Sequence, residues 1–350
     1  MFLSILCFLL VKAHAFSRDI PIVPVQQTRE HLPFPISDET FGDVFNFTNF
    51  NYEGTCGTIF KHPAHTHRDA VIFAMGKLEY RLRSQFFGQA SFAMHLLRRS
   101  LPNARVLLFW FHEPSRELLD FFSAFDVEMY RVVEMEDWHP TNARFPAIHQ
   151  WLQQHVTEFD RIVWSDIRDV YHMTDVFRAF GTDDLIFLDQ GSEAETWNIS
   201  GRVDVEWFEQ FYGKQTTAYF LDNELSILNA GLIFGGVNKT IEALSIIEQC
   251  LFPHHRRYWG YDQSAFNYAY YFGLFDELAP TLVRCSQLLC FTHNSHFRYE
   301  HGVLYEAGTG CSPVVRHKFA EKEVDEPHEN SAWDGTPQIP RWTVTFETFN

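Results

Sequence analysis

Short apolar runs alternate with longer stretches of helical periodicity through the middle of the chain. Five runs are short enough to be buried strands, at residues 70–75, 105–111, 127–133, 161–164 and 185–188. Between them, apolar side chains recur at helical spacing over residues 79–99, 114–125 and 142–159. This alternation predicts an α/β domain with a parallel sheet that has helices on both faces.

Charged residues and prolines predict where two of these helices end or begin. Arg98 and Arg99 complement the negative C-terminal end of the first helix, and Pro102 stops it. Pro114 is predicted at the first position of the second helix, where the missing N–H of a proline costs no hydrogen bond.

The two ends of the chain differ in composition from this central region. Residues 1–15 hold an apolar run followed by Ala-His-Ala, which predicts a cleaved secretory signal peptide. The run is too short to span a membrane, which takes about 20 apolar residues, and no later segment predicts a span. Residues 16–67 are predicted to be an irregular extension, residues 68–320 the folded domain, and residues 321–350 an acidic tail.

A signal peptide places the chain in the secretory pathway, so we expect it in the ER or Golgi lumen or outside the cell. Asn46, Asn198 and Asn238 then become candidate glycosylation sites. Cleavage leaves five cysteines in an oxidising compartment, and an odd number cannot pair completely within one chain. Four of the five lie in the C-terminal third, which favours a cross-link there. Cys285 and Cys290 are close enough in sequence to form one, although the sequence leaves the pairing open.

Composition and charge exclude several classes of protein. Hydrophobic residues make up 46% of the 350 residues, which is too much apolar surface for a disordered chain. The net charge is −17, whereas sequence-independent binding of nucleic acid requires positive charge to displace phosphate counterions. We therefore expect a globular protein that binds no nucleic acid.

Two carboxylates follow the fourth predicted strand. Asp166 and Asp169 lie just beyond residues 161–164, and ligands of open α/β sheets bind beyond the carboxyl ends of the strands. Two carboxylates there can hold a divalent cation, which can neutralise a diphosphate. A turn in which Asp169 pairs with Arg168 explains the same residues without a ligand. The histidines of segment 62–67 could hold a metal ion, but we interpret this segment as a solvated loop.

Five segments together carry a resemblance to a known family. Residues 142–145 read NARF, 161–177 read RIVWSDIRDVYHMTDVF, 228–235 read LNAGLIFG, 261–267 read YDQSAFN, and 314–317 read VVRH. In this order, over roughly residues 70–319, they resemble the nucleotide-diphospho-sugar transferases of the GT-A fold, with features similar to the glycogenin-like branch. The resemblance implies a GT-A-like α/β fold, whose Rossmann-type sheet is mixed, mostly parallel and flanked by helices. It also implies a D-x-D-like metal motif and a nucleotide-sugar donor.

The resemblance also implies roles for individual residues. The implied ligands of a Mn²⁺ or Mg²⁺ ion are Asp166, Asp169 and His317. The residues implied in donor binding are Arg144, Arg168, Asp166 and Gly231. The residues implied in catalysis are Asp262, Gln263 and Asn229.

Side-chain chemistry is consistent with these roles. The amide of Asn229 can meet sugar hydroxyls, and the absence of a side chain at Gly231 lets a donor approach the backbone. Asp262 beside Gln263 pairs an acceptor-only carboxylate with an amide that both donates and accepts. The alternatives are a turn and core strand around Asn229, Asp262 as a helix N-cap, and a purely structural His317. Arg144 could contact the acidic cluster in place of the nucleotide, or be a surface charge of its helix.

The metal motif departs from the family pattern, which has carboxylates at positions i and i+2. Here position i+2 is Arg168, and the second carboxylate is Asp169 at i+3. Two schemes follow: either Asp166, Asp169 and His317 hold a cation, or Arg168 supplies positive charge to the diphosphate beside a weaker or absent metal.

The sequence is therefore interpreted as a secretory hexosyl- or pentosyltransferase that acts on a glycan or glycoprotein acceptor. The N-A-G and D-Q segments look most like those of the retaining, glycogenin-like branch, and this resemblance favours a retaining reaction. An inverting reaction needs a general base, for which Asp262 and Asp222 are candidates. We expect the acceptor side in residues 190–214, with Trp197 and Trp207. The alternative is a catalytically inactive, secreted GT-A-like protein that binds glycan or protein, which the altered metal motif would explain.

Overall fold

The structure is a computed structural model of the chain. It describes residues 19–25, 50–76, 83–133, 135, 137–167, 169–190, 200–284, 289–291, 297–300, 303–306 and 309–317. The predicted signal peptide and acidic tail, and Arg168, Asn46, Asn198, Trp197 and Cys285, lie outside the described residues.

The main sheet has eight strands in the order β1-β4-β3-β2-β5-β8-β7-β9. The strands are β1 (Ile22–Pro24), β2 (Asp69–Met75), β3 (Arg105–Trp110), β4 (Glu128–Val132), β5 (Arg161–Ser165), β7 (Leu185–Asp189), β8 (Leu228–Gly236) and β9 (Thr281–Val283). Strands β4, β3, β2 and β5 run parallel, β7 and β9 are parallel to each other, and β8 runs antiparallel between β5 and β7. The predicted α/β class, with a mixed, mostly parallel sheet flanked by helices, is confirmed.

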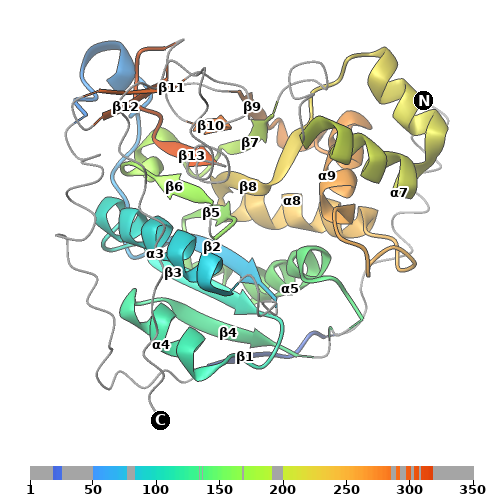
Figure 1. The fold of residues 1–350 in the computed structure, drawn as a ribbon, viewed down its shortest axis with the longest axis horizontal. Helices are drawn as coiled ribbons and strands as arrows, with labels where there is room; N and C mark the ends of the chain where they lie inside the picture. Colours follow the sequence, from blue (N-terminus) through green and yellow to red (C-terminus); the bar gives the residue numbers. More distant parts are fainter. Residues whose placement is uncertain are drawn as a thin grey trace.

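Helices pack on both faces of this sheet and bury two separate apolar cores (Figure 1). One core includes α3 (Arg83–Ser100) and α4 (Arg116–Ala124). The other includes α5 (Pro140–Gln154), α8 (Val237–Cys250) and α9 (Tyr261–Tyr271), and α7 (Ser200–Asp222) packs against α9. Among the helices formed by described residues, none is both long and apolar enough to cross a bilayer.

Helix α4 begins later than its proline predicts. The first helical residue is Arg116, and Ser115 is the N-cap, with its side chain accepting a hydrogen bond from the Leu118 N–H at 3.3 Å. Pro114 precedes the cap, so its prediction at the first helical position is wrong. A serine at this place satisfies an N–H that the helix itself leaves unbonded, and proline has no hydroxyl to do so.

Two smaller sheets lie beside the main one. In the first, β13 (Val315–His317) pairs parallel with β10 (Leu289–Phe291) and antiparallel with β6 (Val170–His172). The second is a hairpin of β11 (Phe297–Glu300) and β12 (Val303–Glu306). Short 3₁₀ turns occur at η2 (Gly54–Gly57), η4 (Val156–Glu158), η5 (Val176–Ala179) and η6 (Asp276–Leu278). Because β6 follows β5 closely, its pairing with β13 brings the end of β13 to the carboxyl edge of the main sheet.

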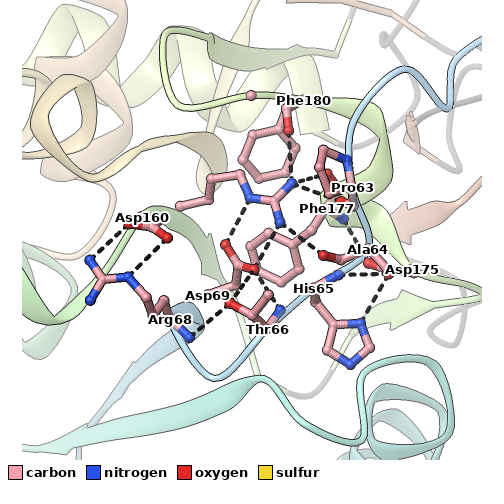
Figure 2. A network of polar contacts seen from close by, with 12 residues as sticks. Pro63, Ala64, His65, Thr66, Arg68, Asp69, Asp160, Asp175, Phe177 and Phe180 are labelled. Atoms are coloured by element: carbon pink, nitrogen blue, oxygen red, sulfur yellow. Dashed lines mark hydrogen bonds and ion pairs between the residues drawn. The ribbon is translucent and has the colours of Figure 1, made fainter.

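At the amino ends of the strands, opposite the carboxyl edge, a buried ion pair connects β2 and β5 (Figure 2). Arg161 at the start of β5 donates to both carboxylate oxygens of Asp69 at the start of β2, at 2.7 and 2.8 Å. The same guanidinium donates to the carbonyl oxygens of Pro63, Phe177 and Phe180. One buried cation thereby joins two strands, the segment before β2 and the turn after β6.

Asp175 attaches the His-rich segment to this network. Its carboxylate accepts from the backbone N–H of Phe177, capping η5, and from both the backbone N–H and Nδ1 of His65 at 3.0 Å. The side chain of His65 is only 9% exposed. The interpretation of residues 62–67 as a solvated loop is therefore wrong for His65, because a carboxylate far away in sequence anchors it. Likewise, Ile22–Pro24 in the predicted irregular extension form β1, which pairs with β4.

A disulfide joins Cys56 to Cys311, which are 255 positions apart in sequence. The expectation of a cross-link within the C-terminal third is therefore wrong for Cys311. The sequence places Cys311 near other cysteines, but the fold places it beside η2, where Cys56 lies. The bridge links the segment before β2 to the segment before β13.

Candidate functional site

The site forms where β8 departs from its partner β7. Phe187 lies opposite Ile233, but the next residue, Leu188, lies opposite Asn229. Residues 230–232 of β8 therefore have no counterpart on β7. Such a bulge leaves backbone groups without their usual ladder partners, and buried groups of this kind need other hydrogen bonds.

Side chains from three elements supply these hydrogen bonds at Ala230. Its carbonyl oxygen accepts from Nε1 of Trp164 at 3.0 Å and from Nη2 of Arg144 at 3.3 Å. Its N–H donates to Oε1 of Gln263 at 2.8 Å. The bulge thus draws together the end of β5, helix α5 and the start of α9.

Three side-chain amides complete the support of the bulge. Oδ1 of Asn229 accepts from the N–H of Gly231 at 2.8 Å, and its Nδ2 donates to Oε1 of Gln190. Nε2 of Gln263 donates to the same oxygen at 3.2 Å. The resemblance implies the amides of Asn229 and Gln263 in catalysis. In the structure, each amide accepts from a backbone N–H of β8, and both donate to Oε1 of Gln190. Gln190 and Trp164 were not singled out from the sequence, because only the bulge gives them a role.

Arg144 bridges two carboxylates at the centre of the site. Its Nη1 donates to Oδ1 of Asp166 at 2.8 Å, and its Nη2 donates to Oδ2 of Asp262 at 2.7 Å. Burial opposes the charge of Arg144, but the two carboxylates outweigh it and raise the pKa of the guanidinium. The resemblance implies donor binding by Arg144; the structure shows the alternative contact with the acidic cluster, and Arg144 is buried rather than a surface charge.

Asp262 is buried in this arrangement. Burial raises the pKa of its carboxyl group, and Arg144 opposes the shift. Helix α9 begins at Tyr261 with Gly260 as its N-cap, so the alternative of Asp262 as the N-cap is wrong. At the second helical position its charge lies near the positive end of the helix dipole, which favours a carboxylate.

Asp166, Asp169 and His317 converge beyond the carboxyl end of β5. Nε2 of His317 lies 3.7 Å from Oδ2 of Asp166 and 3.7 Å from Oδ1 of Asp169. One ligand atom from each residue lies within 4.8 Å of the other two. The cluster arises because His317 pairs with Val170, the first residue of β6, which directly follows Asp169.

The donor set of this cluster fits a hard divalent cation. Two carboxylate oxygens suit Mg²⁺ or Mn²⁺, and an imidazole nitrogen suits Mn²⁺ better. Arg144 engages Oδ1 of Asp166, so Oδ2 is the oxygen that faces His317. Gly231 lies against the same residue, because the Asp166 N–H donates to the Gly231 carbonyl oxygen at 2.8 Å. Arg168, the cationic alternative, lies outside the described residues.

No family model and no curated protein matches the chain. Among solved structures, it is similar to the glycosyltransferase GlyE of Streptococcus pneumoniae TIGR4, with 15% identity and a TM-score of 0.36. The match covers 63% of this chain and 46% of GlyE, so the chain spans about half the length of that protein.

Two further solved structures are similar to the chain. Core-mannan synthase A from Aspergillus fumigatus, in its Mn/GDP form, is 12% identical with a TM-score of 0.32, covering 70% of this chain and 76% of that one. The galactosyltransferase LgtC, in complex with donor and acceptor sugar analogues, is 13% identical with a TM-score of 0.41, covering 72% and 87%. At these scores the likeness assigns no activity to the chain.

Proposed function

We propose that the chain is a glycosyltransferase of the secretory pathway, which transfers a sugar from a nucleotide-diphospho-sugar to a glycan or glycoprotein. The observation that carries the proposal is the convergence of Asp166, Asp169 and His317 beside the Arg144–Asp262 pair. These residues come from separate parts of the sequence and meet at the sheet edge where α/β proteins bind ligands.

In this proposal Asp166, Asp169 and His317 hold Mn²⁺ or Mg²⁺, which supplies positive charge to the departing diphosphate. Arg144 fixes the direction of Asp166 through Oδ1 and leaves Oδ2 toward the ion site. The same arginine holds Asp262, which is placed to accept hydrogen bonds from donor-sugar hydroxyls. The protein thus contributes charge and orientation that exist before the donor binds.

An inverting transfer needs a general base, and neither of the two candidate bases is well placed for that role. Oδ2 of Asp262 already accepts a hydrogen bond from Arg144, so this oxygen is not open to take a proton from an acceptor hydroxyl. Asp222 ends α7 in an exposed position. We therefore propose a retaining hexosyl- or pentosyltransferase.

The proposal is tested by incubating the purified chain with a panel of UDP- and GDP-sugars and Mn²⁺, and measuring nucleotide release with and without EDTA. We expect release that EDTA abolishes and that Asp166→Asn reduces at least about 100-fold, a loss typical of removing one group that stabilises transition-state charge. Asp183→Asn, at an exposed loop position, is the matched control. Undiminished release in EDTA would contradict the metal site.

A second measurement separates the proposed enzyme from an inactive binding protein. Calorimetry with UDP and GDP, each with Mn²⁺, measures nucleotide binding independently of turnover. Neither binding nor release with any nucleotide would overturn the proposed function and favour a GT-A-like domain that binds glycan or protein without transfer.

A further inference from the structure

An exposed aromatic surface adjoins the candidate site. Trp259 is 61% exposed and the preceding Tyr258 is 51% exposed, and Trp207 of α7 is half-buried beside Trp259. We call these three residues the aromatic platform. Large aromatic groups left in water on adjacent positions usually mark a binding surface.

The platform is built by a glycine that admits a tryptophan. The rings of Trp207 and Trp259 meet edge to face, with centroids 4.7 Å apart and planes at 74°. A β-carbon on Gly260 would lie 2.3 Å from the Trp207 ring, and Gly260 has a φ of 80°, in the left-handed region. Both the space and the backbone conformation therefore require glycine. An edge-to-face contact covers at most one face of either ring, which leaves ring surface open to solvent.

Hydrogen bonds fix the platform to the helix that carries Arg144. Nδ2 of Asn142 donates to the carbonyl oxygens of Arg256 and Tyr258, at 2.9 and 2.8 Å. The backbone N–H of His139 also donates to the Arg256 carbonyl oxygen at 2.8 Å. Asn142 precedes Arg144 by two positions in α5. The platform is thus held in place before any ligand arrives, which reduces the entropy lost on binding.

The platform also borders the proposed donor site through α9. Trp259 precedes Asp262 by three positions, and Asp262 is bonded to Arg144. Three residues of chain span at most about 11 Å, so the Cα atoms of Trp259 and Asp262 are within that distance. A sugar ring on the platform would therefore lie within reach of a donor held at Asp262.

Charged groups around the platform provide partners for hydroxyl groups. The guanidinium groups of Arg256 and Arg257 donate to the carboxylate of Asp137, at 3.2 and 3.0 Å. The side chains of Asp137 and Arg257 remain mostly exposed. A pyranose ring combines a flat C–H face with a rim of hydroxyls, which matches an open aromatic surface with charged donors and acceptors beside it.

We propose that the aromatic platform is a carbohydrate subsite, at which one sugar ring of the acceptor stacks on Trp259. The acceptor role rests on the proposed function, whereas the binding of a sugar ring does not. The occupant is a neutral pyranose ring, bound by contact of its C–H face with the indole and by hydrogen bonds to Asp137 and Arg257.

The test is saturation-transfer difference NMR with the methyl glycosides of glucose, galactose and mannose, which needs neither nucleotide nor turnover. We expect saturation of the ring protons of at least one glycoside, and about a tenfold loss of its affinity in Trp259→Ala, the cost of about one aromatic contact. Tyr219→Ala, which removes an aromatic residue that is 47% exposed outside the platform, is the matched control and should bind as the unmodified chain does.

Two further measurements decide the result. Trp259→Phe keeps an aromatic face and should retain most of the binding, while thermal unfolding confirms that each variant folds. No saturation of any of the three glycosides, or equal saturation in Trp259→Ala, overturns the proposal. So does sedimentation that shows a dimer which Trp259→Ala dissociates, because the platform would then be a contact between two copies. Nucleotide binding by calorimetry reports on the proposed function separately.

Discussion

A β-carbon on Gly231 would lie 2.3 Å from Oδ2 of Asp166 and 2.8 Å from its Cγ. Neither residue can easily move away, because their backbones are hydrogen-bonded to each other and Arg144 holds the other carboxylate oxygen. In the sequence analysis, the absence of a side chain at Gly231 is explained by the approach of a donor to the backbone. The structure shows that it also makes room for a candidate metal ligand.

Replacing Gly231 by alanine should therefore displace Asp166. We expect Gly231→Ala to weaken Mn²⁺ binding at least about tenfold, which corresponds to about 1.4 kcal/mol. Titration of Mn²⁺ by electron paramagnetic resonance measures this directly and needs no substrate. Mn²⁺ affinity equal to that of the unmodified chain would show that Asp166 is not a ligand or that it adapts.

Removing the cation between two carboxylates should cost stability. Arg144→Met leaves Asp262 buried with no guanidinium beside it, and breaking a buried ion pair in this way typically costs about 3–5 kcal/mol. Urea unfolding measures the loss. Arg116→Met, which breaks an exposed pair with Asp120, is the matched control and should cost much less.

The loss in Arg144→Met should also depend on pH. Without Arg144, burial and the nearby charge of Asp166 are opposed only by the backbone hydrogen bond from Gln263, so the pKa of Asp262 rises further in the folded chain. A carboxyl group whose pKa is raised on folding stabilises the fold below its unfolded pKa, and this stability is lost as pH rises through the folded pKa. The variant should therefore be closest to the unmodified chain in mild acid. A deficit that does not change with pH would contradict this account.

The Arg161–Asp69 ion pair, at the amino ends of β5 and β2, should affect stability without affecting the site. Arg161→Met leaves the buried Asp69 without its partner, and we expect a loss of about 3–5 kcal/mol. Nucleotide binding well below the melting temperature should be unchanged, since Arg161 lies at the amino end of β5 and the site at its carboxyl end. Arg68→Met, which breaks a more exposed pair with Asp160, is the control. Loss of nucleotide binding in folded Arg161→Met would contradict the separation of the two edges.

His172 should make the fold sensitive to acid. Both of its ring nitrogens are buried with no hydrogen-bond partner among the described residues, and burial lowers its pKa to about 3. As pH falls below about 6.5, the unfolded chain binds a proton at this histidine and the folded chain does not, so stability falls.

We expect His172→Leu to remove this contribution. Relative to the unmodified chain, the variant should gain about 2 kcal/mol of stability between pH 7.5 and pH 5. Urea unfolding of both proteins at the two pH values measures the difference, and the other titrating groups cancel in the comparison. Parallel pH dependences for the two proteins would show that His172 is protonated in the fold.

Regular structure could be predicted because the apolar runs are short and clearly bounded. Residues 105–111 and 161–164 match β3 (Arg105–Trp110) and β5 (Arg161–Ser165) to within a residue. The cluster of Asp166 with His317 could also be anticipated, since the resemblance relates their segments. These predictions depend on local pattern or on motifs that keep their order.

The contacts that define the site could not be predicted, because they depend on where β8 leaves β7. Because of that bulge, the side chain of Asn229 accepts from a backbone N–H, and the carbonyl oxygen of Ala230 accepts from Arg144. The partner of Cys311 could not be predicted either, because other cysteines lie nearer to it in sequence than Cys56 does. Each of these contacts joins residues that are brought together by packing alone.

The Cys56–Cys311 bridge turns most of the polypeptide into a covalent ring from which two open ends emerge. The β-bulge, Arg144, Asp166 and Asp262 all belong to the ring, whereas His317 is on the C-terminal end, six residues beyond the junction. Proteolysis at one point inside the ring would leave a single disulfide-linked molecule that keeps its mass on a non-reducing gel. A cut just after the junction would sever the covalent link between the ring and the strand that carries His317, which would then be held by its pairing with β6 and β10 alone.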